Sequence, residues 1–506
     1  SYAANGLSWT TADKAGYPNN LMNGDKGDFA PRIGAAYKLN SKTVVRGSYG
    51  MYYWTVPNSQ MLSSQLGSVP LALEYTMMMD WWEVEPGKRV DWYDVFHMPL
   101  PGIRVGDPNM IDITSLQSVP KPFGFTPFPR DMRNARVQQW NFTTEREIAP
   151  LTSLRLTYTG NHGSNLMQTV QTNGTEPRYY YTLRTGQLPE SSDQLRANPF
   201  WQELPYRQPV GYSNNNQLQV NLERRSSKGL QYQWYYVFTR ALSTSDADEG
   251  YASNPGMVAP DSVVLPDGVT NPVPLSERLR LVYSNVAGIP KHQVNWNFIY
   301  DLPFGRGKSL GGNASAALNH IIGGWQIASM GGFHTGQWLT PDFNESDPGA
   351  WWAINYQMLR DPRLSKSEQQ VINYQERRQL LYFAGYFDAT GTGLTNYRPA
   401  LAPPGADGSN NVPVTLSSGE TVDVPYVVYN SMPRNFIQGP SNWNADFSLF
   451  KNFQIRENMR LRVTADAFNL FNHPNNKDPD LTTGLVDLGV SANAPRIIQF
   501  SARFDF

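Results

Sequence analysis

The stretch RIIQFSARFDF, residues 496–506, alternates apolar and polar side chains with a period of two. Charged and amide side chains occupy the positions between the apolar ones. A period of two is the signature of a β-strand whose two faces contact different surroundings. The apolar face of this predicted strand carries Ile498, Phe500, Ala502, Phe504 and Phe506.

The same alternation recurs in LQYQWYYVF (230–238), HQVNWNFIY (292–300) and MRLRVTADA (459–467). Sheets of soluble proteins that have one solvent-exposed face also show alternating apolar and polar residues. This alternation alone therefore does not distinguish a soluble β-protein from a membrane barrel. Together these and similar segments predict about eleven strands. They lie near residues 29–40, 43–57, 136–148, 152–168, 215–226, 230–244, 291–302, 323–340, 443–455, 459–472 and 496–506.

The connections between these strands favour a membrane barrel. Tight turns such as LNSKT, IAPLTS, RRSSKG and IRENM alternate with long excursions at residues 58–135, 169–214, 245–290 and 341–442. Short turns at one end of a sheet and long loops at the other are typical of outer-membrane barrels. The sequence predicts an all-β protein, a portion of a transmembrane antiparallel β-barrel with long extracellular loops. Residues 1–28 are expected to form an N-terminal loop or strand remnant, and residues 29–506 the barrel portion.

Composition agrees with this class. The chain has 506 residues, no cysteine, 13% aromatic residues and a formal net charge of −1. A near-zero charge without a basic tract argues against nucleic acid as a partner. No run of 18 apolar residues is present, so strands would be the means of crossing a bilayer. Outer-membrane lipid is the expected surrounding.

The stretch DLPFGRGKSLGG, residues 301–312, contains Gly-Arg-Gly-Lys-Ser and superficially suggests a phosphate-binding loop. Leu302 occupies the position where that motif needs its first glycine. We therefore expect Lys308 and Ser309 to be turn residues between two strands, at the end that carries the short turns. The following ASAALNHII, residues 314–322, is expected to add a short helix.

Signatures of catalysis and metal binding are not found in the sequence. Hydrolase motifs of the G-x-S-x-G and H-E-x-x-H types are absent. The six histidines are more than ten residues apart and are expected in turns or in the wall: His97, His162, His292, His320, His334 and His473. Asp246, Asp248 and Glu249 could hold calcium or form a solvated acidic turn, and the turn is favoured. We expect no enzyme activity, no cofactor and no metal.

The long excursions carry clustered aromatic side chains that could contact a cargo or a partner. The alternative is that these rings bury one another as a cap on the barrel. The candidate contacts are Trp81, Trp82, Trp92, Tyr93, Trp351 and Trp352. Residues 364–387 are expected to form a helix capped by Ser367. Its packing positions would be Val371, Tyr374, Leu381 and Phe383.

Several stretches, in order from residue 29 to residue 506, resemble the C-terminal half of a TonB-dependent outer-membrane receptor barrel of the Oar-like group. They are FAPRIGAAYKLNSKTVVRGSYGMYY, VQQWNFTTEREI, NQLQVNLERRSSKGLQYQWYYVFTRAL, YDLPFGRGKSL, GGWQIASMGGFHTGQWLTP, NWNADFSLFKNFQI and LRVTADAFNLFNHPN. The resemblance implies TonB-dependent uptake or export of a cargo selected by the extracellular loops. It also implies that Phe500, Phe504 and Phe506 form the signal for barrel assembly.

The sequence also departs from that group. Neither the regulatory and plug domains nor the TonB-binding box is found in it, and eleven strands are half of the 22 in a plugged transporter. We expect a missing N-terminal barrel and plug portion, or a second chain, to complete the wall and to contact the TonB complex. Two other functions remain open: a docking component of a cell-surface assembly that transports nothing, and a soluble all-β carbohydrate-binding protein.

Overall fold

The computed structural model describes residues 13–14, 16–18, 23–55, 130–171, 178–196, 205–227, 229–244, 251–252, 279–280, 283–341, 357–358, 361–385, 401–402, 411–425, 434–456 and 459–506. One large sheet dominates these residues, and all eleven predicted strands are confirmed in it. In spatial order they are β1 (Arg32–Asn40), β2 (Thr43–Trp54), β3 (Ala135–Ala149), β4 (Thr152–Gln171), β5 (Pro205–Ser227), β6 (Leu230–Ser243), β9 (His292–Asp301), β10 (Trp325–His334), β19 (Asn442–Arg456), β20 (Met459–Phe468) and β22 (Ile497–Asp505).

The remaining elements are short. β7 (Tyr251–Ala252) pairs with β4, and β8 (Ser284–Asn285) pairs with β6. Four small sheets combine β11 (Trp338–Leu339) with β18 (Ile437–Gln438), β12 (Gln357–Met358) with β15 (Leu401–Ala402), β13 (Gln370–Tyr374) with β14 (Arg377–Leu381) and β21 (Leu485–Asp487), and β16 (Asn411–Thr415) with β17 (Thr421–Pro425). The helical elements are α3 (Arg178–Thr185), the 3₁₀ turn η2 (Ser192–Leu195) and α5 (Ala316–Ile322).

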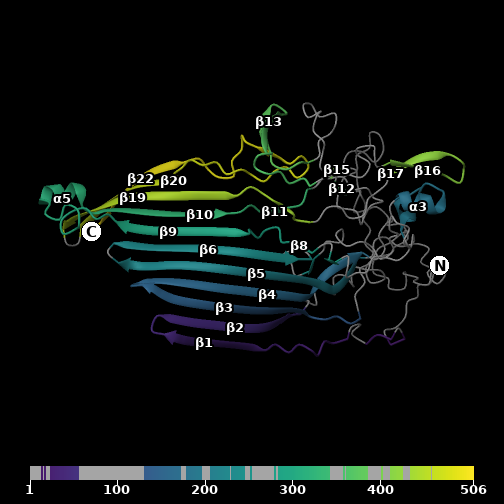
Figure 1. Ribbon diagram of the computed structural model, residues 1–506, viewed down its shortest axis with the longest axis horizontal. Helices are drawn as coiled ribbons and strands as arrows, with labels where there is room; N and C mark the ends of the chain where they lie inside the picture. The colour runs from purple at the N-terminus through teal and green to yellow at the C-terminus, as the bar shows by residue number, and fades with distance from the viewer. Residues whose placement is uncertain are drawn as a thin grey trace, which may run out of the picture.

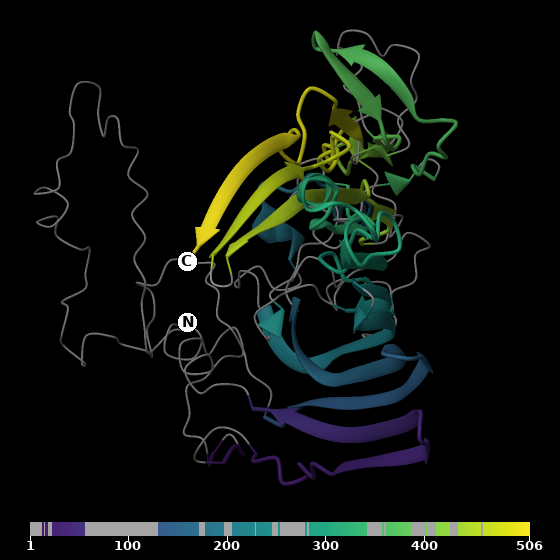
Figure 2. The ribbon, with the colours of Figure 1, turned by 90° about the vertical axis from the view of Figure 1, so that its left-hand side faces the viewer.

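The two ends of the large sheet differ in their connections. Tight turns and α5 lie at one end, whereas the small sheets and α3 gather at the other (Figure 1). Seen from the turn end, the large sheet curves into an arc that opens between β1 and β22 (Figure 2). Among the described strands, β1 pairs only with β2, and β22 pairs only with β20. Each edge therefore presents one unpaired side of its backbone.

Among the described residues, no helix is both long and apolar enough to cross a membrane.

The strand registers join the alternating side chains into rows that run across the sheet. Directly paired residues project to the same face of the sheet. A row of paired residues is therefore uniformly apolar or polar only when every strand keeps the correct register, because a slip by one residue moves a strand's side chains to the other face. One row is apolar from β4 to β19: Leu154, Leu222, Trp234, Trp296, Gly331 and Ala445. Its next member, on β3, is Arg146. The neighbouring row on the opposite face is mainly polar: Ser153, Glu223, Gln233, Asn297, Met330 and Asp446.

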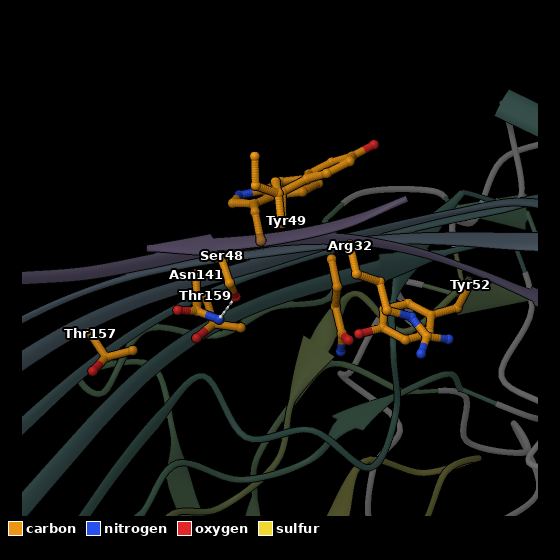
Figure 3. Close-up of a pocket in the computed structure, with 12 residues that line it drawn as sticks. Arg32, Ser48, Tyr49, Tyr52, Asn141, Thr157 and Thr159 are labelled. Atoms are coloured by element: carbon orange, nitrogen blue, oxygen red, sulfur yellow. Dashed lines mark hydrogen bonds between the residues drawn. The ribbon is translucent and has the colours of Figure 1, made fainter. Parts of the chain in front are cut away.

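The apolar face is the convex one. Figure 3 shows Tyr49 on the outer side of the sheet and Ser48, Asn141 and Thr159 on the inner side, toward the strands across the arc. Tyr49 pairs with Ile33 and so belongs to the apolar face. The arc thus has an apolar exterior and a polar interior, which is the arrangement of a barrel wall in a membrane.

Aromatic rings mark the two borders of the apolar face. Trp443 and Phe453 lie on this face of β19, ten residues apart and about 33 Å apart along the strand. A strand tilt of about 40° reduces this to a height of about 25 Å, the height of the apolar band of an outer-membrane barrel. The face therefore has the dimensions of a lipid contact.

Two glycines on the apolar face allow a tryptophan to lie flat over the neighbouring strand. A Cβ atom at Gly331 would overlap the ring of Trp296, and one at Gly160 would overlap the ring of Trp140. A ring that covers a strand glycine restores the packing that the glycine lacks. Glycine here provides space for large lipid-facing rings.

The structure corrects the predicted limits of several strands. β5 begins at Pro205, ten residues before the predicted start, because β4 and β5 stay paired through bulges on either side of Leu166. Pro209 and Gly211 suggest a loop in the sequence, yet the bulges accommodate both within the ladder. β10 ends at His334, and β20 ends at Phe468 because Asn469 has a left-handed φ of 48°.

The helix predicted over residues 364–387 is wrong. This segment forms the β13–β14 hairpin, whose two turn residues Gln375 and Glu376 have φ values of 50° and 60°. Positive φ at both central residues is the geometry of a tight hairpin turn. β14 also pairs with β21, a segment more than 100 residues away. Leu381 and Phe383 are buried as predicted, but Val371 is exposed and Ser367 lies in a turn instead of capping a helix.

The two faces can be compared energetically at adjacent residues of β19. Leu449 is apolar and pairs with Ile327 and Ala465, whereas Ser448 projects to the opposite face and donates to the Asp466 carboxylate at 2.6 Å. Leu449→Arg in lipid vesicles should lower the free energy of unfolding by about 2–4 kcal/mol, the cost of an arginine near the bilayer midplane. Ser448→Arg should cost less than about 1 kcal/mol, because the arginine stays in water and can pair with Asp466. Denaturant titration measures both, and equal penalties would contradict the assignment of the faces.

Candidate functional site

The polar concave face forms a hydrogen-bonded surface between strands. Thr143 and Thr157 lie 3.0 Å apart across β3 and β4, and the Gln217 amide donates to the Thr239 hydroxyl at 3.1 Å. The Asn141 amide donates to the Ser48 hydroxyl at 2.5 Å (Figure 3). Neutral amides and hydroxyls in such rows can exchange hydrogen bonds with a passing polar solute without a large desolvation penalty.

A hollow of about 580 Å³ lies in the wall formed by β1 to β4. Its concave lining combines one cation with neutral polar groups: Arg32, Ser48, Gln139, Asn141, Thr157 and Thr159. The Arg32 guanidinium lies over the ring of Tyr52, 4.6 Å from its centroid. No carboxylate is among the lining residues, so the hollow suits an anionic or hydroxyl-rich group.

Closer to the turn end, the concave face carries a small ionic cluster. Oε2 of Glu145 accepts hydrogen bonds from Arg46 at 3.1 Å and from Arg155 at 3.3 Å. Both arginine side chains are about half exposed, so solvent screens these pairs and they contribute little to stability. Their role is to hold charged groups in the water-filled side of the wall.

At the loop end, a buried arginine joins distant segments to the wall. Arg434 donates to the Ser243 carbonyl of β6 at 2.7 Å and to the Ser284 hydroxyl of β8 at 3.2 Å. Asn435 and Asn285 exchange amide hydrogen bonds of 2.8 Å and 3.0 Å with each other's backbone carbonyls. These bonds fix the end of the 341–442 excursion against the barrel strands. Sequence reasoning missed Arg434, since nothing in SMPRN distinguishes it from a surface arginine.

The described part of the loop region has a small core of its own. Leu381 and Leu485 are buried, with Leu364, Ile372 and Tyr374 packed against them. The Tyr382 hydroxyl donates to the Gln438 carbonyl at 2.9 Å. Burial raises the pKa of Tyr382 to about 12, so the phenol remains a donor at neutral pH. This part of the loop end is therefore an ordered platform.

The candidate contact residues fall outside the part of the chain that the structure describes. This applies to Trp81, Trp82, Trp92, Tyr93, Trp351 and Trp352, and also to Asp246, Asp248 and Glu249. Their roles remain predictions.

The three phenylalanines of the expected assembly signal lie at the edge of the sheet. Phe500 and Phe504 project from β22 to the apolar face, opposite Ala465 and Leu461. Phe506 follows the strand, is 94% exposed, and stacks on Phe504 with the ring centroids 6.0 Å apart. These rings extend the apolar face to its turn end.

Three of the histidines in the described residues have clear structural contacts. His162 lies on β4 and bonds to Asn214, and His292 lies on β9 and bonds to the Tyr236 hydroxyl. His473 stacks on Trp443 with the ring centroids 4.5 Å apart. No group of three potential metal ligands occurs among the described residues.

The stretch 301–312 connects β9 to α5 as a compact turn, as predicted. Its backbone N–H groups donate to carbonyls of the same turn: Gly305 to Leu310, Gly307 to Gly312, Lys308 to Gly305, and Leu310 to Pro303. A phosphate cradle needs such N–H groups to point at the ligand. Here four of them, including those of Gly305, Gly307 and Lys308 in the glycine-rich part, are already bonded within the turn, so this stretch is a structural turn.

The apolar convex face, the polar concave face and the ordered loop end define an outer-membrane barrel wall. The family model for the outer membrane beta barrel domain matches residues 2–499, and the chain belongs to this family. It is therefore a protein of the outer membrane.

Solved structures of larger proteins resemble this chain. The outer membrane transporter YddB from Escherichia coli is 11% identical, with a TM-score of 0.40, and the match covers 97% of this chain and 42% of YddB. FpvA from P. aeruginosa, bound to heterologous pyoverdines, is 11% identical with a TM-score of 0.35 and coverages of 95% and 33%. The siderophore receptor PiuA from Acinetobacter baumannii is 7% identical with a TM-score of 0.35 and coverages of 94% and 35%. The chain thus spans less than half the length of each. No match is found among curated proteins.

Proposed function

We propose that this chain is part of the wall of a TonB-dependent receptor of the Oar-like group, which moves a cargo across the outer membrane. The observation that carries the proposal is the continuous polar concave face, which is suited to a water-filled lumen. The ordered platform at the loop end supports a role in selecting cargo. The quoted sequence stretches add the resemblance to TonB-dependent receptors.

The long excursions are placed outside the cell in this proposal, and the tight turns with α5 are placed in the periplasm. Cargo would first meet the loop end, where Trp81, Trp82, Trp92, Tyr93, Trp351 and Trp352 are candidate contacts. It would then pass the amide and hydroxyl rows of the concave face. No chemical step is assigned to the chain, whose part is recognition and passage.

Further strands must complete the wall in this proposal. The free edges of β1 and β22 would leave backbone groups without partners in lipid, at several kcal/mol for each group. We place the missing strands, the plug and the segment that contacts TonB in another portion of the same polypeptide or in a second chain. Outer-membrane lipid covers the convex face in either case.

Uptake can be tested without knowing the cargo. Cells that lack the gene and cells that lack TonB are grown in the same rich medium, and the compounds left unconsumed are identified by mass spectrometry. Compounds spared by the gene deletion should be a subset of those spared by loss of TonB, because the same energy source drives both. A compound that requires the gene but is consumed normally without TonB would contradict the proposal.

The same assay tests the loop residues. Trp81→Ala with Trp82→Ala, or Trp351→Ala with Trp352→Ala, should reduce consumption of the affected compound at least tenfold at limiting concentration, as expected for hot-spot contacts of 1–2 kcal/mol or more. Trp234→Ala on the convex face is the matched control and should leave consumption unchanged. If the protein is instead a docking component, the loop variants should show no uptake defect. The wild-type protein should then bind a stoichiometric external partner, and the loop variants should fail to bind it.

Assembly of the barrel depends on the last strand in this proposal. Phe504→Ser with Phe506→Ser, placed in the complete gene, should sharply reduce the heat-modifiable protein in outer-membrane fractions. The reason is that these substitutions remove two rings that serve as the proposed assembly signal and also contact lipid. Gln499→Ser, on the opposite face of β22, is the control and should assemble normally. Wild-type amounts of the double variant in the membrane would refute the signal.

A further inference from the structure

The connection between β9 and β10 has an unusual surface for a turn. It is amphipathic, and four of its large apolar side chains are exposed: Phe304, Leu310, Leu318 and Ile321, with exposures of 40%, 50%, 46% and 69%. Leu318 and Ile321 are three residues apart on α5 and so share one face of the helix. A turn surrounded only by water gains nothing from presenting these side chains.

The turn is held in one conformation. The Ser315 hydroxyl caps α5 by accepting from the Leu318 N–H at 3.3 Å, and the Asn319 side chain accepts from the Arg306 N–H at 2.7 Å. The second bond ties the first half of the turn to the helix. The apolar side chains are thus presented by a fixed structure.

The end of α5 is attached to the convex face of the sheet. Its last carbonyls include that of Ile321, which accepts from Trp325 Nε1 at 2.9 Å and from Lys451 Nζ at 2.6 Å. Trp325 and Lys451 are paired residues of β10 and β19, in the same row as Val463 and Ala502 of the apolar face. The helix therefore sits beside the lipid-facing surface and not inside the arc.

The surroundings of Lys451 stabilise its positive charge at the turn end of the apolar face. Its side chain is almost fully buried, and its ammonium lies 4.8 Å from the Trp325 ring centroid and 4.9 Å from the Phe453 ring centroid. Two aromatic faces and a helix carbonyl partly offset its charge. Tryptophan and lysine in this arrangement are typical of the boundary between hydrocarbon and headgroups.

The charges of the turn have one sign. Between Leu302 and Trp325 the sequence contains Arg306 and Lys308 and no acidic residue. Both basic side chains are exposed. A turn that combines exposed apolar side chains with two exposed basic ones complements a leaflet that contains anionic phospholipids.

We propose that residues 303–324 form an interfacial foot that inserts Leu318 and Ile321 into the periplasmic leaflet and binds anionic phospholipid headgroups through Arg306 and Lys308. The foot fixes the depth of β9, β10 and β19 in the membrane. This inference requires the outer-membrane location but is independent of cargo transport, so the two can fail separately.

Insertion can be measured with a spin label, because the chain has no native cysteine. Ile321→Cys and, as a control at the exposed β1–β2 turn, Ser41→Cys are labelled in the complete protein reconstituted in phosphatidylglycerol-containing vesicles. The label at residue 321 should collide more often with oxygen than with a water-soluble nickel chelate, and the label at residue 41 should show the reverse. Dominant nickel collisions at residue 321 would overturn the proposal, because they would place the foot in water.

Headgroup binding is tested separately by native mass spectrometry of the detergent-solubilised protein with added phosphatidylglycerol or phosphatidylethanolamine. Arg306→Gln with Lys308→Gln should weaken phosphatidylglycerol binding by roughly 10- to 30-fold, because each basic residue near a lipid surface contributes about a fivefold factor or slightly less. Lys42→Gln, at another turn of the same end, should have little effect. Heat-modifiability verifies that each variant is folded. Unchanged phosphatidylglycerol binding in the double variant, or equal loss in Lys42→Gln, would contradict the anionic headgroup site.

Discussion

The backbone hydrogen bond is the constraint on which this structure depends. Lipid provides no partner for an N–H or a carbonyl group, so each group must be paired within the wall. Between β1 and β22 an unbroken antiparallel ladder satisfies this, and the bulges beside Leu166 keep β4 and β5 paired over a long stretch. Only the outer sides of β1 and β22 have no partner among the described strands. The ladder fixes the registers, and the registers place every side chain on one of two faces.

The different solvents on those faces account for the remaining features. Tryptophan rings cover glycines on the convex face, where lipid replaces the neighbours that a soluble core would supply. Amides, hydroxyls and the Glu145 cluster occupy the concave face, where water screens their charges. At the loop end, Arg434 attaches the end of the 341–442 excursion to β6 of the wall, and the β13–β14–β21 sheet joins that excursion to the connection between β20 and β22. At the turn end, α5 lies on the rim next to Trp325.

The sequence was sufficient to predict the eleven strands, because successive residues of each strand face lipid and water in turn and are therefore apolar and polar in turn. It also predicted the turn and short helix between β9 and β10, where a broken glycine pattern excluded a phosphate loop. It failed for residues 364–387, because the pairing partner of that segment, Leu485–Asp487, is distant in the chain and leaves no local signal. Arg434 was missed for the same reason. Composition drew attention to the aromatic loop residues, which lie outside the described residues.

Our central proposal is that the arc from β1 to β22 belongs to a closed wall between lipid and a polar lumen. Residue-resolved amide hydrogen exchange in outer-membrane vesicles tests it most directly, with β5 as the internal standard for a fully paired strand. In a closed wall, all amides of β22 and β1 should exchange as slowly as those of β5, because both edges have partners. Rapid exchange of every second amide in β22, with β5 still protected, would show an open edge and contradict the account.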